Sequence, residues 1–158
     1  IIEECAFQSC VSLPEIDIPN TVTSIAKSAF SGCHSLSKVI LPNSITCLED
    51  HIFRRCYSLK ELIIPESVVK ISKGCFFECN SLTEINIPKL VTKIGELSFT
   101  RCYSLIGITL ERYVNNRNDK YRLKRLIADL SNCGNAPLMC TIYPPLKKKH
   151  FWSKYYFE

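Results

Sequence analysis

The chain has 158 residues, of which 46% are hydrophobic and 22% are charged, and its formal net charge is +5. This composition is typical of a soluble globular chain of one domain. No apolar run approaches the roughly 20 residues that a membrane helix needs, so we expect no transmembrane segment in this chain.

A 23-residue repeat runs through the first 110 residues. Phenylalanine recurs at this constant interval, and a cysteine follows three residues later in every copy: Phe7, Phe30, Phe53, Phe76 and Phe99, with Cys10, Cys33, Cys56, Cys79 and Cys102. Serine, leucine and further aliphatic residues come next at fixed phases, and a proline closes the segment at Pro19, Pro42, Pro65 and Pro88. A fixed period of this length is the sequence signature of a solenoid.

Each copy contains a short strand, in which two inward aliphatic residues flank one outward residue. A coil of this size cannot bury its own apolar edge, so successive coils must stack in parallel, with equivalent residues about 4.8 Å apart. Burial of a large apolar side chain contributes roughly 1.5 to 3 kcal/mol. The pattern therefore predicts a core built on the phenylalanine ladder and predicts that one copy alone does not fold.

The combined pattern SLxxIxIPxxVxxIxxxxFxxC resembles the BspA-like leucine-rich repeats over about residues 1–110. The resemblance implies a leucine-rich-repeat solenoid, with a parallel β-sheet of stacked 23-residue coils. It also implies a surface or secreted protein of bacteria or parasitic protists that mediates adhesion or protein binding, and hence a cell-surface or extracellular location. Two features depart from the family pattern: its usual glycine stands only at Gly95, and the last 48 residues match no pattern that we recognise.

The N-terminus lies inside a repeat, because Ile2 and Phe7 already occupy the phases of Ile25 and Phe30. We therefore expect a partial first repeat and a truncated N-terminus. Residues 1–110 hold 10 Lys/Arg and 11 Asp/Glu, whereas residues 111–158 hold 10 and 4, which gives net charges of −1 and +6. The sequence thus predicts a solenoid over 1–110 and a basic cap or tail over 111–158.

The basic segment contains apolar residues at helical spacing: Leu123, Leu126, Ile127 and Leu130. This spacing predicts a helix near residues 119–132, which we interpret as a short C-terminal helical cap over the last coil. A basic amphipathic helix that meets an acidic partner or a membrane surface is the alternative. The stretch from Lys147 to Trp152 mixes lysines with aromatic rings as single-strand nucleic-acid binders do, but four lysines on a short tail are weak support, so nucleic acid is not an expected partner.

Five of the ten cysteines belong to the repeat. In-register parallel positions point their Cβ atoms the same way, which is poor geometry for disulfides, so we predict reduced thiols that pack as small apolar groups and donate weakly to the turn backbone. Cys47 shares its column with Ser24, Lys70 and Lys93, which predicts exposure and makes it the thiol we expect to be modified first. Cys133 and Cys140 either pair across a loop or stay free.

No metal, cofactor or catalytic site is predicted. The cysteines and histidines have no zinc spacing, and the chain has no phosphate loop, nucleophile elbow or zinc-protease motif. Serine and cysteine recur in every copy, whereas a catalytic group is needed once. An enzyme is therefore the least favoured of the function classes.

The outward strand positions form two columns on one sheet face: Glu15, Lys38, Glu61, Glu84 and Gly107, then Asp17, Ile40, Ile63, Asn86 and Thr109. Ile40 and Ile63 are neighbours on a face that is otherwise polar. We predict that they form the centre of a binding site for a protein or glycan, with Lys38, Glu61, Glu84 and Asn86 around it. Alternatively, the two isoleucines only pack on each other and stiffen the sheet. The predicted function is a protein-binding or adhesion module, with a structural spacer as the alternative.

Overall fold

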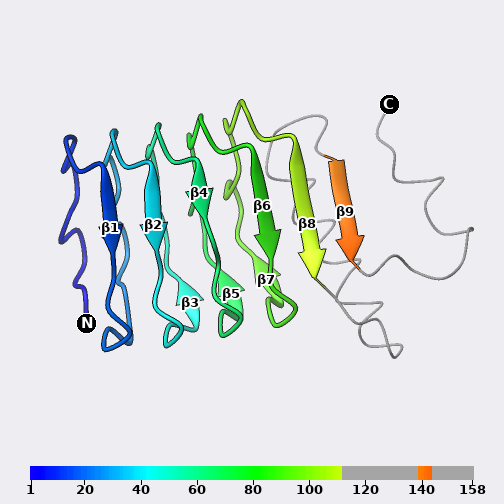
Figure 1. The fold of residues 1–158 in the computed structure, drawn as a ribbon, viewed down its shortest axis with the longest axis horizontal. Helices are drawn as coiled ribbons and strands as arrows, with labels where there is room; N and C mark the ends of the chain where they lie inside the picture. The colour runs from blue at the N-terminus through cyan, green and yellow to red at the C-terminus, as the bar shows by residue number, and fades with distance from the viewer. Residues whose placement is uncertain (112–138, 144–158) are drawn as a thin grey trace, which may run out of the picture.

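The computed structural model describes residues 1–111 and 139–143, in which the chain winds through nine strands and no helix (Figure 1). The strands are β1 (Glu15–Asp17), β2 (Lys38–Ile40), β3 (Cys47–Leu48), β4 (Glu61–Leu62), β5 (Lys70–Ile71), β6 (Glu84–Ile87), β7 (Lys93–Ile94), β8 (Gly107–Glu111) and β9 (Met139–Tyr143). Six of them stand side by side in a front row (β1, β2, β4, β6, β8 and β9), and β3, β5 and β7 form a second row on the other side of each coil (Figure 1).

All hydrogen-bonded strand pairs are parallel. They form three ladders, in the orders β1-β2-β4, β6-β8-β9 and β3-β5-β7. In the ladders from β1 to β8, each residue pairs with the residue 23 positions later, as in Ile16↔Val39 and Ile85↔Ile108. The predicted parallel stacking of 23-residue coils is therefore confirmed.

The phenylalanine ladder forms the centre of the core, as predicted. Phe30, Phe53, Phe76 and Phe99 are all 0% exposed. Their rings stack nearly parallel, with centroids 5.1 Å apart for Phe7 and Phe30 and 5.3 to 5.9 Å apart further along. The backbone joins the coils at the same positions: the amides of four of these residues (Phe7, Phe30, Phe53 and Phe76) donate to carbonyls of the next coil, as Phe53 N does to Cys75 O at 2.9 Å. Each coil is thus fixed to its neighbour through both its backbone and its core ring.

The front strands form because their residues alternate between the core and the outer face. In β2, Val39 is buried at 3% exposure, whereas Lys38 and Ile40 on either side of it face outward. Alternation with period two is the pattern of a half-buried strand. Pro42 follows the inward Leu41 and has no amide hydrogen to extend the ladder, so the chain turns away there.

The second row of strands was not predicted. Its inward residues Leu48, Ile71 and Ile94 are buried, and the sequence showed them only as aliphatic residues that recur at a fixed phase. Each strand is only two residues long, which is too short for an alternating pattern to be visible in the sequence. The other residues of these strands, Cys47, Lys70 and Lys93, pair in register and form a column on the outer side of the second row.

Strand β9 is a further rung of the front row that the sequence analysis missed. It pairs with β8 over five residues, from Gly107↔Met139 to Glu111↔Tyr143. Met139 lies 32 residues after Gly107 rather than 23, so a search at constant period passes over it. The predicted helical cap near 119–132 lies outside the described residues.

Two positions in each coil adopt left-handed backbone, and most of them are not glycine. One set is Cys5, Ser28, His51, Gly74 and Leu97, and the other is Ser9, Gly32, Arg55, Glu78 and Arg101, with φ between 58° and 77°. Such a conformation costs a non-glycine residue roughly 1–2 kcal/mol. The turn around each phenylalanine therefore repeats because stacking imposes it, even where the local residue disfavours it.

Candidate functional site on the front sheet

The outward residues of the front row form the columns that the sequence predicts. Glu15 pairs with Lys38 and Lys38 with Glu61 in one column, and Asp17 pairs with Ile40 in the next. Further along, Glu84 pairs with Gly107 and Asn86 with Thr109. These side chains therefore share one surface, which extends over several coils.

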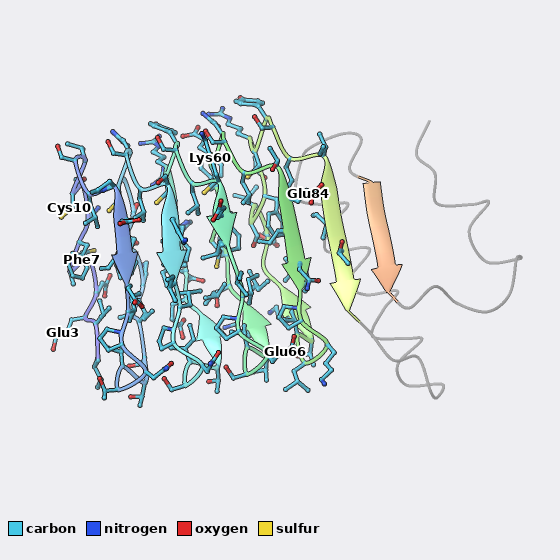
Figure 2. All side chains as sticks on the ribbon, viewed as in Figure 1. Glu3, Phe7, Cys10, Lys60, Glu66 and Glu84 are labelled. Atoms are coloured by element: carbon cyan, nitrogen blue, oxygen red, sulfur yellow. The ribbon has the colours of Figure 1, made fainter. Side chains whose placement is uncertain are left out.

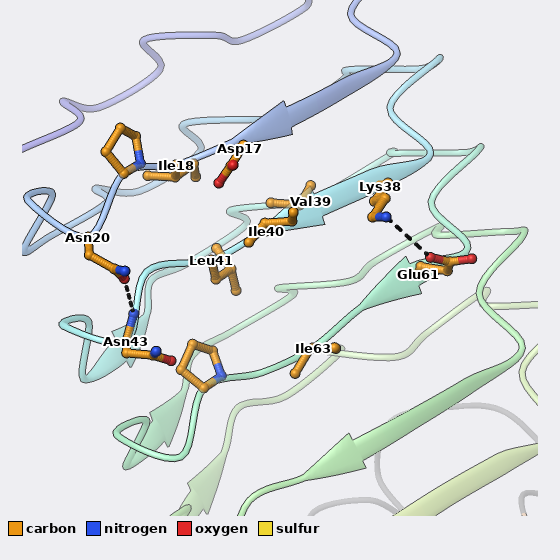
Figure 3. Close-up of a pocket in the computed structure, with 12 residues that line it drawn as sticks. Asp17, Ile18, Asn20, Lys38, Val39, Ile40, Leu41, Asn43, Glu61 and Ile63 are labelled. Atoms are coloured by element: carbon orange, nitrogen blue, oxygen red, sulfur yellow. Dashed lines mark hydrogen bonds and ion pairs between the residues drawn. The ribbon is translucent and has the colours of Figure 1, made fainter.

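A shallow hollow of about 450 Å³ lies on this surface over β1, β2 and β4 (Figure 3). We call it the sheet-face hollow, and it is lined by residues of three coils, among them Asp17, Lys38, Ile40, Asn43, Glu61 and Ile63. Four of the six predicted site residues, Lys38, Ile40, Glu61 and Ile63, thus come together at one place. Glu84 and Asn86 lie on β6, exposed on the same face but outside the hollow.

The two isoleucines are exposed to very different degrees, at 49% for Ile40 and 84% for Ile63. Ile63 follows directly after the last residue of β4, where the β2–β4 ladder ends at Val39↔Leu62. A side chain with 84% of its surface in water makes few contacts with any neighbour. Mutual packing that stiffens the sheet is therefore a weak account of Ile63.

The outward charges of the front sheet face are mostly acidic, although only Asp17, Lys38 and Glu61 of them line the hollow. Glu15, Asp17, Glu61 and Glu84 are all exposed on the face, and among these outward positions only Lys38 is basic. The Lys38 Nζ lies 4.0 Å from the Glu61 Oε2, and both side chains are largely in water, at 51% and 76% exposure. Exposed pairs of this kind contribute little to stability. The five charged groups leave the face with a net charge of −3.

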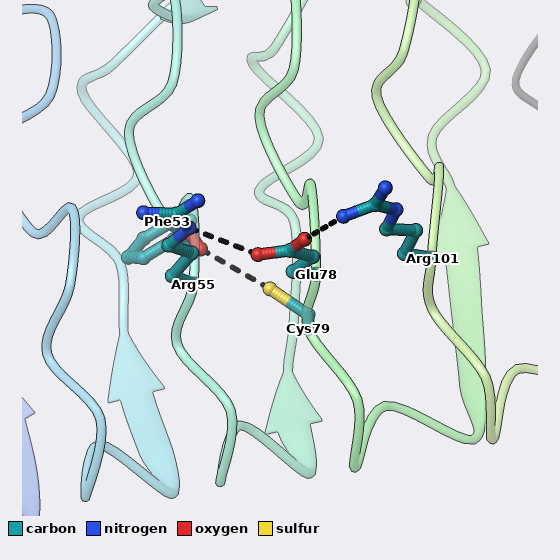
Figure 4. A network of polar contacts seen from close by, with 5 residues as sticks. All are labelled: Phe53, Arg55, Glu78, Cys79 and Arg101. Atoms are coloured by element: carbon teal, nitrogen blue, oxygen red, sulfur yellow. Dashed lines mark hydrogen bonds and ion pairs between the residues drawn. The ribbon is translucent and has the colours of Figure 1, made fainter.

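A second polar cluster, on the turn after the phenylalanine, was not predicted (Figure 4). Arg55 Nε donates to Glu78 Oε2 at 2.9 Å, and Arg101 Nη1 donates to Glu78 Oε1 at 2.6 Å. These hydrogen bonds, Arg101 foremost, hold the pKa of the Glu78 carboxyl below its ordinary value. Both guanidinium partners come from adjacent coils, 23 residues before and after Glu78, so the cluster fastens three coils together. The three residues occupy one column, which also holds Ser9 and Gly32, and a column of such mixed residue types gave no signal in the sequence.

The ladder thiols bond to the backbone as predicted. Cys33, Cys56, Cys79 and Cys102 each donate through Sγ to the carbonyl of the phenylalanine 26 residues earlier, at 3.0 to 3.2 Å. Burial raises the pKa of Cys33 to about 11, and it also raises the pKa of Cys56 and Cys79. These thiols are therefore protonated donors that close the turn.

Two expectations about individual thiols are wrong. Cys10 belongs to the ladder but is exposed, whereas the ladder thiols of the later coils are buried. Cys47 was expected to be solvent-exposed, but it is half-buried, with its Sγ 3.4 Å from Ser72 Oγ. Burial raises the pKa of Cys47 as well. Cys10 therefore replaces Cys47 as the more accessible of the two.

Within residues 1–109, where side chains are described, no group of three His, Cys, Asp or Glu residues is arranged to hold a metal ion. In the same part of the chain, no helix has the length and apolar character to cross a membrane. The side chains in view, shown together in Figure 2, instead gather their apolar groups inside the coils and their charges on the outer faces.

Comparison with known proteins places this solenoid in a family. The description "BspA type Leucine rich repeat region" matches residues 1–121 in six copies. Among solved structures, the chain is similar to a leucine-rich-repeat protein of T. pallidum, with 30% identity and a TM-score of 0.65 over 72% of this chain and 56% of that one. It is also similar to a leucine-rich cell surface protein of Faecalibacterium prausnitzii A2-165, with 35% identity and a TM-score of 0.64 over 77% and 31% of the two chains.

A third similar structure is a leucine-rich-repeat protein of Bacteroides ovatus ATCC 8483, with 27% identity and a TM-score of 0.63 over 71% of this chain and 37% of that one. The similarity thus spans between about a third and just over half of the length of these proteins. A search of curated proteins gave no match. Since the family description covers most of the sequence and the fold agrees with it, the chain belongs to the BspA-type leucine-rich repeat family.

Proposed function

We propose that this chain is a non-enzymatic protein-binding module and that its partner docks on the sheet-face hollow. The observation that carries the proposal is the pair Ile40 and Ile63, which are 49% and 84% exposed in a hollow that Asp17, Lys38 and Glu61 also line. Exposed apolar groups surrounded by polar residues are the usual anatomy of a protein interface, with an apolar centre and a charged rim.

The chemistry of the hollow favours a protein over a glycan. Its centre is aliphatic, from Ile40, Leu41 and Ile63, and the residues that line it include prolines and no aromatic ring. A site of this kind is suited to an apolar side chain of the partner, which would be desolvated on docking. Contacts in such a centre, rather than total area, account for most of the affinity of an interface.

Membership in a repeat family that forms interaction modules supports the same function. The similar protein of F. prausnitzii is described as a cell surface protein, which supports a surface or extracellular location and a role in adhesion for this chain. Both remain part of the proposal.

The experiment is a pair of double variants measured in the same cell-binding assay. Ile40→Asp with Ile63→Asp should abolish binding of beads coated with the chain, because two carboxylates replace the apolar centre. Val69→Asp with Leu90→Asp is the matched control: these aliphatic residues are also exposed, at 42% and 48%, but lie outside the hollow. Binding should survive in the control.

A thermal melt of each variant separates the proposal from its alternative. If the isoleucines only stiffen the sheet, the Ile40→Asp and Ile63→Asp double variant keeps its binding and loses melting temperature, since adjacent carboxylates on a sheet repel. That outcome would assign the chain a spacer role. Loss of binding with an unchanged melt supports the docking site.

A further inference from the structure

The turn that follows each phenylalanine of the ladder carries a group of aromatic rings and arginines. We call this group the turn-edge surface, and its members are His34, Arg54, Arg55, Tyr57, Phe77 and Arg101. None of them lines the sheet-face hollow. Arginine and aromatic residues are the types enriched at the centres of protein interfaces. The composition of the turn-edge surface is therefore that of an interaction site.

Ring contacts join the members of this surface across neighbouring coils. Phe77 is half-buried, and the Cζ atoms of Arg54 and Arg101, from the coils before and after it, lie 5.5 and 5.8 Å from the centroid of its ring. Tyr57 stacks on His34 with ring centroids 4.7 Å apart. Contacts between cations and rings and between stacked rings are attractive. The rings and guanidiniums therefore hold one another in place.

Two of the arginines are also held by the buried carboxylate of Glu78. Arg55 Nε and Arg101 Nη1 donate to its two oxygens, yet their own side chains stay exposed, at 46% and 57% (Figure 4). Ordering a long side chain is part of the free-energy cost of association. Because the folded chain already orders these guanidiniums, a partner that binds them loses little free energy in this way.

Arg54 and Arg55 keep hydrogen-bond donors for a partner. Within the described residues Arg54 makes no hydrogen bond or ion pair, and its contact with the Phe77 ring uses the charge of the guanidinium rather than its N–H groups. Arg55 binds Glu78 through Nε, and its Nη1 and Nη2 have no acceptor in the same part of the chain. A guanidinium fork of this kind matches the geometry of a carboxylate.

The charge of the surface indicates which partner fits it. Three arginines against Glu78 give a net charge of +2. A sulfated polysaccharide or a nucleic acid is held mainly by many neutralised charges, and here a carboxylate lies between the cations. A protein segment with carboxylates beside an apolar side chain can use both the guanidinium forks and the rings of Tyr57 and Phe77. The surface therefore favours an acidic protein segment.

We propose that the turn-edge surface is a second interaction site of this chain and that it binds an acidic protein segment. Carboxylates of the segment bind Arg54 and Arg55, and an apolar side chain next to them packs on Tyr57 and Phe77. The site is independent of the sheet-face hollow, because the two share no residue. The chain can therefore contact one partner at two places, or two partners at once.

Protection of arginine from phenylglyoxal tests the site on the full chain. The probe is a glutamate-rich peptide that contains phenylalanine, and its control has glutamine in place of glutamate. Mass spectrometry should show that the acidic peptide slows modification of Arg54, Arg55 and Arg101 several-fold, whereas the control peptide does not. Residues 111–158 also contain arginines, among them Arg112 and Arg125. Protection confined to that basic segment would overturn the proposal.

Substitutions at Arg54 and Arg55 separate guanidinium forks from charge in general. The readout is the peptide concentration that half-protects Arg101, which every variant retains. Arg54→Lys with Arg55→Lys keeps the charge but lacks the forks, so this concentration should rise about tenfold or more, as for an interface hot spot. An unchanged value would overturn the binding of carboxylates by these forks.

A charge-matched pair of variants provides the control. Arg54→Gln with Arg55→Gln should abolish protection of Arg101. Lys70→Gln with Lys73→Gln removes the same charge from two exposed lysines outside the surface and should leave protection nearly unchanged at physiological salt, where distant charges are screened. An equal loss in both pairs would mean that net charge alone attracts the peptide, and it would overturn the site.

Melts followed by circular dichroism establish that each variant is folded. Arg54→Lys alone leaves both hydrogen bonds of Glu78 in place, so it continues the test if the changes at Arg55 unfold the chain. Heparin is the polyanion probe: protection of Arg101 by heparin but not by the acidic peptide would overturn the protein partner in favour of a polysaccharide.

The same readout separates this site from the proposed function. Ile40→Asp with Ile63→Asp should keep the protection of Arg101 whether or not it abolishes cell binding, because these residues lie in the hollow. If this variant is folded and loses the protection, the acidic peptide binds the sheet face and the second site is wrong.

Discussion

Substitution of Phe53 by alanine tests the ladder at its centre. The ring is 0% exposed and stacks on Phe30 and Phe76 with centroids 5.7 and 5.9 Å away. The neighbouring coils cannot close the gap, because backbone bonds such as Phe30 N to Ile52 O at 3.0 Å and Phe53 N to Cys75 O at 2.9 Å fix their spacing. Phe53→Ala should therefore leave a cavity and lower the free energy of unfolding by about 3–5 kcal/mol.

The same substitution at the first coil provides the internal comparison. Phe7 is half-buried and stacks on one ring only, Phe30, at 5.1 Å. Phe7→Ala should cost about 1–2 kcal/mol, because less surface is returned to water and one stacking contact is lost rather than two. In a chain of this size each kcal/mol lowers the melting temperature by about 2–4 °C.

Urea denaturation followed by circular dichroism measures both variants. Equal losses at Phe7 and Phe53 would contradict the view that a ring is stabilised by coils on both sides. A loss below about 1 kcal/mol at Phe53 would mean that the ladder does not carry the core energy assigned to buried aromatic side chains.

Three further predictions concern groups outside the ring ladder. Alkylation of the native chain should label Cys10 quickly and Cys56 only as fast as the chain unfolds, and rapid labelling of Cys56 would contradict its burial. Glu78→Gln should lower the melting temperature by a few degrees at neutral pH. Since the pKa of Glu78 is lowered in the folded chain, the stability that its carboxylate contributes is complete above the ordinary carboxyl pKa of about 4.3 and is lost as the pH falls through the folded pKa. The melting temperatures of the native chain and of Glu78→Gln should therefore converge in acid. Gly74→Ala should lower the free energy of unfolding by about 1–2 kcal/mol because of the φ of +59° alone, and by more because the new Cβ would lie 2.5 Å from His51 Nδ1. In a His51→Ala background only the loss due to this contact should disappear. Denaturation of Gly74→Ala, His51→Ala and the double variant would measure both effects.

The core and the outward columns could be predicted because they repeat. Phe53 and Ile40 each have equivalents at a constant interval, so phase alone tells which residue enters the stack and which faces water. Phase alone does not predict how far a residue is buried by the coils next to its own. Cys10 shares the phase of Cys33 but is exposed where Cys33 is buried.

Contacts between chemically different residues of one column could not be predicted from the sequence either. Arg55, Glu78 and Arg101 occupy equivalent positions, yet their meaning lies in the alternation of charge across three coils rather than in any shared residue type. The left-handed backbone at His51 and Leu97 could not be predicted either, because neither residue is glycine. Stacking of the coils imposes this conformation there in spite of its local cost. Whether Ile40 and Ile63 bind a partner is likewise a question that phase does not answer.

The connection between β8 and β9 is longer than one repeat, and this length shows how the front sheet can gain a further strand. Its rung keeps the register of β8 although 32 residues, not 23, separate Gly107 from Met139. By loop-closure scaling, the nine additional residues cost only about 0.3 kcal/mol. A rung therefore requires a short strand in register, and the length of chain between rungs is nearly free to vary. Insertions can thus decorate the border of the sheet without disturbing its face, and a count of regular repeats in the sequence gives a lower bound on the width of the surface.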